Sequence, residues 1–176
     1  TSEVFDIREY RSGDTSHRIH WKLSAKTDDF MVKEYSLPME RTVLLFLDLH
    51  IGKEEKFTQQ KLDHFLEILA SLSWSMQEQN WHHKVIWWDE QNQMLKEADV
   101  SSEEETFRML EQICSSRVYS KAYEIQELYF RQFGERTEEL GMQLDISGKL
   151  YHGGRCIKVF RQEKLEEDLM EWELEL

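Results

Sequence analysis

Long apolar runs are missing from this sequence, and so are the common signatures of zinc, phosphate and nucleophile sites. The longest purely apolar stretch, residues 43–47, falls far short of the roughly 20 residues that span a bilayer. The two cysteines, Cys114 and Cys156, lack CxxC or Cys/His spacing, so we expect inert thiols in a reducing compartment. The sequence also has no glycine-rich phosphate loop and no GxSxG elbow. These absences argue against a membrane span, a cofactor and a catalytic centre.

Positive charge is also scarce. Lysine and arginine total 22 against 35 aspartate and glutamate residues, a formal net charge of −13. Such a surface repels polyphosphate and anionic headgroups, so we expect neither nucleic-acid binding nor membrane contact. Only residues 1–36, with six basic and seven acidic side chains, approach neutrality. That segment is the candidate for a basic face.

The single proline marks an expected division of the chain. Pro38 interrupts regular structure because its ring fixes φ and its nitrogen carries no proton. Before it, residues 4–10 and 30–35 have strand character, and residues 15–26 suit a short helix. We therefore expect a strand-helix-strand segment over residues 1–37, packed on the rest of the chain in one globular unit.

The main domain, residues 38–176, is expected to alternate strands with helices. Continuous apolar runs indicate buried strands, and apolar residues three and four apart indicate helices. Strands separated by helices favour a mostly parallel sheet covered on both faces, since parallel strands need long crossovers. The predicted fold is a three-layer, Rossmann-like α/β sandwich. Its strands are expected at 41–49, 84–88, 94–100, 142–147 and 155–160, and its helices at 58–79, 103–114, 121–133 and 165–176.

Two of the predicted helices have an apolar face that we expect to be buried. Phe107, Leu110 and Cys114 form the expected apolar face of the helix at 103–114. In the acidic C-terminal segment, Leu169 and Trp172 belong to a stripe that we expect to dock on its own domain. The alternative is that this C-terminal stripe is presented to another protein as an amphipathic helix.

Residues 6–35 carry the most specific pattern in the chain. They contain R-x-Y-x-x-G-D, then R-I-H-W-K-x-S-A-K, then V-K-E-Y, and this arrangement resembles the signature of the domain-of-unknown-function 58 family. The order of elements after Pro38 is similar to the von Willebrand A-like half of that family. The matching positions are Arg8, Tyr10, Gly13, Asp14, Arg18, Ile19, His20, Trp21, Lys22, Ser24, Ala25, Lys26, Val32, Lys33, Glu34 and Tyr35.

The resemblance implies a partner and no reaction. Members of the family are bacterial, have membrane spans before the signature, and are encoded beside MoxR-type AAA+ ATPases. On that ground we expect a non-catalytic adaptor domain at the cytoplasmic face of the cell membrane, working with a MoxR-type ATPase. The partner would bind the loops at the strand ends or the signature segment.

A von Willebrand A-like fold also implies a metal site at the end of its first strand, where D-x-S-x-S binds a cation such as Mg²⁺. Here Asp48 keeps the carboxylate, but His50 and Gly52 replace the two serines, so the site is degenerate. The alternative function is a divalent-metal-dependent binding module built on Asp48 and His50. Without metal, Asp48 would cap backbone amides, and Asp89 could share its crevice.

The charged signature segment allows three hypotheses. The favoured one is an internal network in which arginines pair with acids and orient the segment. A second is a cationic stripe beside Trp21 that binds an acidic protein surface or a phosphate. A third is a metal chelated by His17 and His20. The network would use Arg8, Arg11, Arg18, Asp14 and Glu34, and the stripe Arg18, Lys22 and Lys26.

Overall fold

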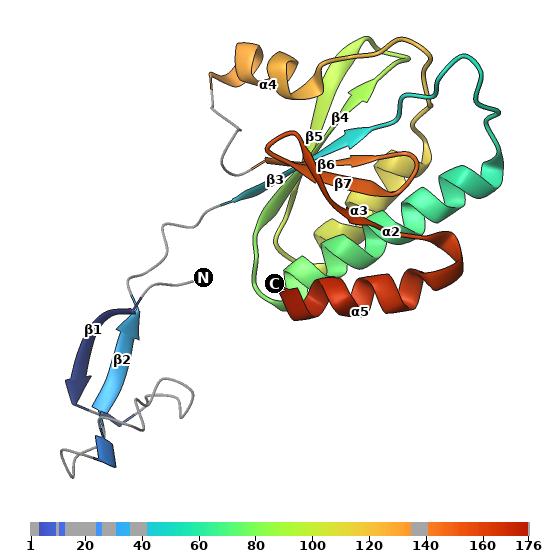
Figure 1. The fold of residues 1–176 in the computed structure, drawn as a ribbon. Coiled ribbons are helices and arrows are strands. Elements are labelled where there is room, and N and C mark those ends of the chain that lie inside the picture. The colour runs from blue at the N-terminus through green and yellow to red at the C-terminus, as the bar shows by residue number, and fades with distance from the viewer. Residues whose placement is uncertain are drawn as a thin grey trace. The chain divides into compact units, whose positions relative to one another are not determined.

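The computed structural model describes residues 4–9, 11–12, 24–25, 31–35, 42–134 and 141–175. The chain divides into two compact units, Thr1–Arg41 and Thr42–Leu176, and each is described by itself (Figure 1). The boundary lies beside the expected joint at Pro38. Packing of the first unit on the second stays a prediction.

The first unit contains an antiparallel pair of strands, β1 (Val4–Glu9) and β2 (Met31–Tyr35), in which Arg8 lies opposite Val32. The Ser24 hydroxyl accepts the backbone N–H of Met31 at 2.9 Å, which ties the helical residues 24–25 to the start of β2. Both predicted strands are confirmed. Most of the helix predicted at 15–26 lies outside the described residues.

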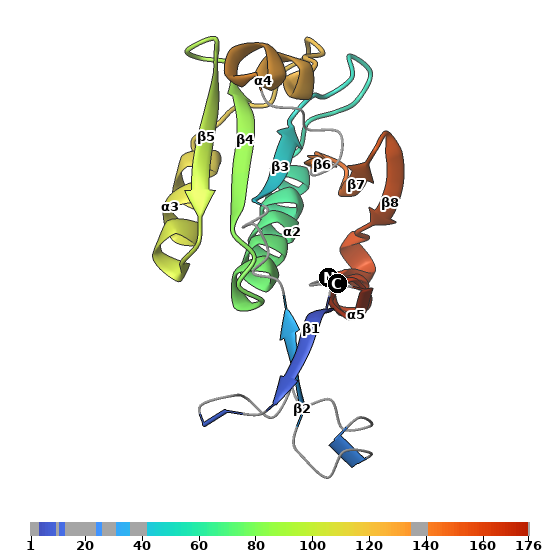
Figure 2. The same ribbon diagram turned by 90° about the vertical axis from the view of Figure 1, so that its left-hand side faces the viewer.

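The second unit is built on a six-stranded mixed sheet, which Figure 2 shows from one side. The strand order is β5-β4-β3-β6-β7-β8, with β3 at the centre. Strand β3 runs parallel to both of its neighbours, and the other pairings are antiparallel. The strands are β3 (Val43–Asp48), β4 (His83–Asp89), β5 (Met94–Val100), β6 (Gly141–Asp145), β7 (Lys149–His152) and β8 (Arg155–Val159).

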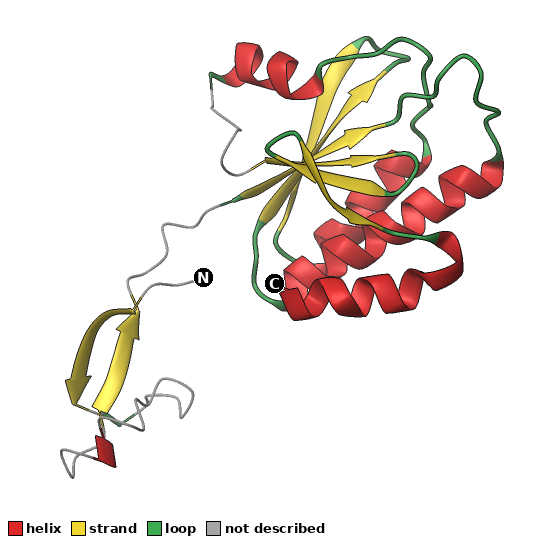
Figure 3. Cartoon of the chain, in the orientation of Figure 1, coloured by secondary structure: helices red, strands yellow, loops and turns green. Residues whose placement is uncertain are grey.

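Four helices of the described part of this unit cover the sheet unequally (Figures 1 and 3). Helices α2, α3 and α5 lie on one face, and the short α4 lies on the other. The side chains of β3 alternate between the two sides, so Leu45 and Leu47 pack in the larger cluster while Leu44 and Phe46 contact α4. The helices are α2 (Gln59–Glu78), α3 (Glu103–Cys114), α4 (Ile125–Phe133) and α5 (Leu165–Glu175).

Helix boundaries follow the capping residues. The Thr58 hydroxyl accepts the N–H of Lys61 at 3.2 Å and begins α2, as predicted. In the same way, the Ser102 hydroxyl accepts the N–H of Glu105 and begins α3. Gly134, with a φ of 69°, ends α4 in the left-handed conformation that glycine favours. Helix α5 docks on its own domain, since Trp172 is only 6% exposed.

Three details of the predicted fold are wrong. The sheet is not mostly parallel, because short turns join β4 to β5, β6 to β7 and β7 to β8, and tight turns give antiparallel pairs. Strand β7 was not expected. The buried face of α3 is formed by Met109 and Ile113, whereas Phe107 and Cys114 are exposed. Among the described residues, no helix is long and apolar enough to cross a membrane.

Candidate functional site

The carboxyl ends of the three central strands form the candidate site. Strands β3, β4 and β6 run in the same direction, so their last residues, Asp48, Asp89 and Asp145, share one edge of the sheet. Asp48 and Asp145 are register partners on adjacent strands. Loops at this edge of an open α/β sheet are where ligands of such folds usually bind.

The loop after α3 closes one side of this edge. Beyond β3, the backbone of residues 49–51 pairs with Tyr119: the N–H of Ile51 donates to the Tyr119 carbonyl at 2.9 Å, and the N–H of Tyr119 donates to the Leu49 carbonyl at 3.2 Å. The Tyr119 phenol oxygen accepts the N–H of Leu49 at 3.3 Å. Burial, followed by the nearby Asp48 carboxylate, raises the pKa of Tyr119, so its phenol stays protonated.

Asp48 is half-buried at the centre of the edge. Its Oδ1 accepts the backbone N–H of His50 at 3.1 Å, the capping role expected of it in the absence of metal. Burial raises its pKa above the ordinary 3.8, the hydrogen bond from His50 opposes that rise, and the carboxylates of Asp145 and Glu124 add to it. The site is therefore a concentration of negative charge.

The His50 ring contacts the loop after α3. Its Nε2 lies 3.1 Å from the carbonyl oxygen of Ser120, and because a carbonyl only accepts, Nε2 carries the proton and donates it. That nitrogen is thus occupied by the loop after α3. Among the residues that the structure describes, no group of three or more His, Cys, Asp or Glu side chains is arranged to hold a metal ion.

Asp89 lies at the same edge but serves the β4–β5 turn. Its Oδ1 accepts the N–H groups of Gln91 and Asn92, and its Oδ2 accepts the Asn92 amide at 2.7 Å and lies 2.9 Å from Lys96 Nζ. The hydrogen bond from the Asn92 side chain is the largest of the effects that lower the pKa of Asp89 to about 2. Its carboxylate is therefore committed to the hairpin.

Asp145 performs the same task for the β6–β7 turn. Its Oδ1 accepts from the N–H and hydroxyl of Ser147 and from the N–H of Lys149, at 3.0, 2.7 and 2.9 Å. Gly148 in this turn has a φ of 85°, and a Cβ there would meet the Phe160 carbonyl at 2.7 Å, so only glycine fits. Burial and the Asp145 charge raise the pKa of Tyr151 beside it.

Aromatic side chains border the anionic edge. Trp88 stacks on Tyr123 with ring centroids 4.6 Å apart, and Tyr119 meets Tyr123 edge-on at 5.1 Å. Glu90 Oε2 accepts from both Trp88 Nε1, at 2.9 Å, and the Tyr123 hydroxyl, at 2.8 Å. The ammonium of Lys121 lies 5.2 Å from the Tyr123 ring centroid. The arrangement is a rigid aromatic and carboxylate surface.

Sequence reasoning missed most of this surface. It named Asp48, His50 and Asp89, but not Tyr119, Tyr123, Glu90, Glu124 or Asp145. The available signal was the alternation of aromatic and charged residues in the run Tyr119-Ser-Lys-Ala-Tyr123-Glu124, but residues 121–124 were assigned to the helix predicted at 121–133, whereas α4 begins at Ile125. Nothing local says that this loop pairs with the chain beyond β3.

A serine–histidine pair lies elsewhere in the second unit. Ser73 Oγ on α2 is 2.6 Å from His83 Nε2 at the start of β4, and His83 Nδ1 is 3.1 Å from the Trp81 carbonyl. Both residues are at most 1% exposed, so no substrate reaches the pair. Its hydrogen bonds hold α2 to the amino end of β4.

Most of the signature residues lie outside the described residues. Arg8 is placed in β1 by its backbone, and Arg11 is exposed. The three hypotheses for the signature segment, including the His17 and His20 chelate, depend mainly on side chains outside the described residues, so they stay predictions. The predicted binding residues that lie outside the described residues are Tyr10, Gly13, Asp14, Arg18, His20, Trp21, Lys22 and Lys26.

Fold and site together define an α/β domain with a mixed six-stranded sheet and an anionic, aromatic surface at its strand ends. The chain belongs to the DUF58 family, described as Protein of unknown function DUF58, which matches residues 6–160. That range includes the signature segment and every strand of the sheet. Neither a curated protein nor a solved structure matches the chain.

Proposed function

We propose that this chain is a non-catalytic protein-interaction domain that binds its partner at the carboxyl ends of β3, β4 and β6. The observation that carries the proposal is the surface formed by Trp88, Tyr123, Glu90 and Glu124 beside Asp48. Tyrosine and tryptophan supply rigid contact area, and they are enriched among the residues that dominate binding energy at interfaces. A partner with arginine or lysine at its centre complements the charge.

The acids of this edge favour binding over catalysis. Asp89 and Asp145 hold turns, His50 Nε2 donates to a carbonyl, and the Tyr119 phenol accepts a backbone N–H. Groups committed to the fold make poor general bases, because each proton transfer would cost a structural hydrogen bond. The alternative of a divalent-metal-dependent module at Asp48 and His50 needs further donors from the partner.

The resemblance of the signature segment suggests the class of protein that binds this chain. Its resemblance to proteins encoded beside MoxR-type AAA+ ATPases supports a MoxR-type ATPase as the protein bound at the cytoplasmic face of a bacterial membrane. The von Willebrand A-like relationship belongs to the same proposal, and the order β5-β4-β3-β6-β7-β8 around a central first strand is compatible with it.

Biolayer interferometry with the purified MoxR-type ATPase of the same bacterium tests this function. Glu124 is exposed and makes no side-chain cap bond to α4, so Glu124→Lys spares the fold. We expect it to weaken binding at least tenfold, about 1.4 kcal/mol. Lys121→Glu, which removes a cation from the same surface, should strengthen binding. Asp99→Lys, at an exposed position of β5 opposite the amino end of β4, is the distant control, and a loss confined to that variant would overturn the strand-end proposal.

A further inference from the structure

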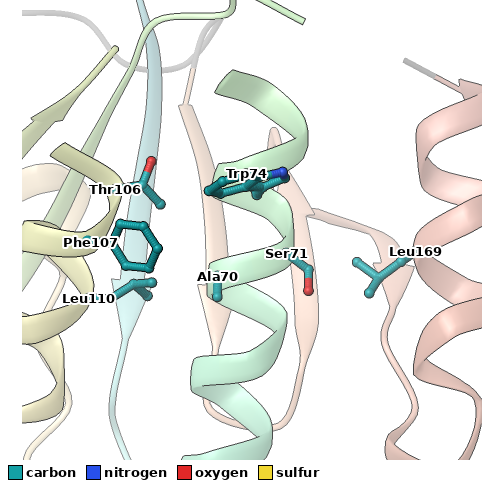
Figure 4. A pocket seen from close by; sticks show the side chains of 7 residues that line it. All are labelled: Ala70, Ser71, Trp74, Thr106, Phe107, Leu110 and Leu169. Carbon is teal, nitrogen blue, oxygen red and sulfur yellow. The ribbon is translucent and has the colours of Figure 1, made fainter. Parts of the chain in front are cut away.

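The helical face of the second unit contains an apolar trough. Helix α2 lies between α3 and α5 and forms its floor, where the small residues Ala70 and Ser71 leave room above the backbone (Figure 4). Side chains of α3 rise on one side and Leu169 of α5 on the other. The pocket measures about 390 Å³ and is lined by Ala70, Ser71, Trp74, Thr106, Phe107, Leu110 and Leu169.

Large apolar groups in this trough face solvent. Phe107 is 57% exposed and meets the half-buried Trp74 edge-on at 6.3 Å. Phe107 does not pack in the core, because α3 contributes Met109 and Ile113, which are completely buried. A contiguous exposed patch of this kind marks a binding surface more often than an exposed single residue does.

The three helices that form the trough carry an excess of negative charge. Helices α2, α3 and α5 together carry 13 acidic residues against two basic ones, Lys61 and Arg108. Arg108 is already paired with Glu104. Exposed glutamates stand at helical spacing from the lining residues, namely Glu67 and Glu78 on α2, Glu103 and Glu111 on α3, and Glu166 on α5.

We propose that this trough binds an amphipathic helix of a partner protein, with large apolar side chains on one face and lysine or arginine along its borders. Two helical ridges over a floor of small residues admit a helix that inserts side chains spaced three and four apart. The borders of that helix meet the glutamates. A second copy of this chain carries the same −13 charge and is repelled. This surface is separate from the strand-end surface, so the proposal stands independently of the proposed function.

The probe is a synthetic 18-residue helix with leucine on one face and lysine on its borders, titrated onto the whole chain. A thiol-reactive fluorophore on Cys114, one turn beyond Leu110 on α3, reports binding in a Cys156→Ser background. The same fluorophore on Cys156 in a Cys114→Ser background is the control for position, since Cys156 lies on β8. We expect saturable binding, weakened by salt, that changes the emission at Cys114 alone.

Phe107→Ser is the decisive variant, and Phe130→Ser on α4 is its matched control, because both side chains are exposed phenylalanines on helices of opposite faces. The expected result is an affinity at least tenfold lower for Phe107→Ser and unchanged for Phe130→Ser. Equal binding by a helix with glutamate in place of lysine, or equal affinity of Phe107→Ser and the native chain, overturns the proposal. If the native chain self-associates and Phe107→Ser does not, the trough binds a second copy of this chain, and the proposal is overturned.

Discussion

The Ser73 hydroxyl lies 2.6 Å from Nε2 of His83 in the interior of the second unit. Nδ1 of the same ring faces the Trp81 carbonyl, so Nδ1 carries the proton and Nε2 accepts from Ser73. Burial lowers the pKa of this imidazole below the ordinary 6.5, which favours its neutral form. A polar pair of this kind contributes to stability only while both of its hydrogen bonds are intact.

His83 makes the fold sensitive to mild acid. The folded state binds its proton less tightly than the unfolded chain, so stability that is complete above about pH 6.5 is lost as the pH falls below that value. We expect the free energy of unfolding, measured with urea at pH 7.5 and 5.5, to fall less in His83→Gln than in the native chain. His82→Gln, at the exposed neighbouring position, is the control. An unchanged pH dependence in His83→Gln would contradict the assignment.

Asp168 and Arg161 predict a second pH effect. The Asp168 carboxylate, in a residue only 1% exposed, accepts from the Arg161 backbone N–H, Nε and Nη2 at 2.7, 3.1 and 2.7 Å. These bonds lower its pKa from 3.8 to about 2, so the stability it contributes is present above pH 4 and lost as the pH falls to 2. Asp168→Asn should cost about 1–3 kcal/mol at pH 7 in urea unfolding. Glu167→Gln, exposed on the same helix, should cost almost nothing.

Tyr119→Phe tests the attachment of the loop after α3. The substitution leaves the ring in place and removes the oxygen that accepts the buried N–H of Leu49. An unpaired buried donor costs about 1–3 kcal/mol, which thermal or urea unfolding resolves. Tyr123→Phe should cost less, because Glu90 keeps its bond from Trp88. Equal losses in the two variants would show that the Leu49 contact does not stabilise the loop.

Removal of divalent cations is expected to leave the fold unchanged. His50 Nε2 is occupied by the Ser120 carbonyl and Asp48 caps the His50 amide, so neither is arranged as a preformed ligand pair. The midpoint of thermal unfolding should therefore agree in EDTA and in millimolar Mg²⁺, Ca²⁺ or Mn²⁺. A rise with one cation that Asp48→Ala abolishes would instead establish the metal-dependent module, because a ligand bound only by the native state stabilises it.

Local sequence signals predicted most elements of the second unit. The apolar run at 43–47 produced β3, and Thr58 began α2 where the capping residue indicated. Periodicity failed by one position in α3, where two adjacent apolar stripes compete. Phe107, Leu110 and Cys114 satisfy helical spacing as well as Met109 and Ile113 do, and only the position of the helix over the sheet decides which stripe is buried.

The candidate site was less predictable because it depends on contacts between distant segments. Asp48 was identified from its place after a buried strand. Its setting depends on Tyr119 and Asp145, about 70 and 100 residues along the chain, which no local pattern connects to it. Strand β7 was also missed, since a strand of four residues gives too few alternations to recognise.

The most direct test of the central claim is photocrosslinking from the two ends of the sheet. A photoreactive phenylalanine analogue replaces Glu54, exposed in the loop that follows β3, or Gln79, exposed at the end of α2 before β4. Each variant is mixed with the MoxR-type ATPase and irradiated. The strand-end account predicts a crosslink from position 54 and none from position 79. A crosslink from position 79 alone, or from neither position, would contradict it.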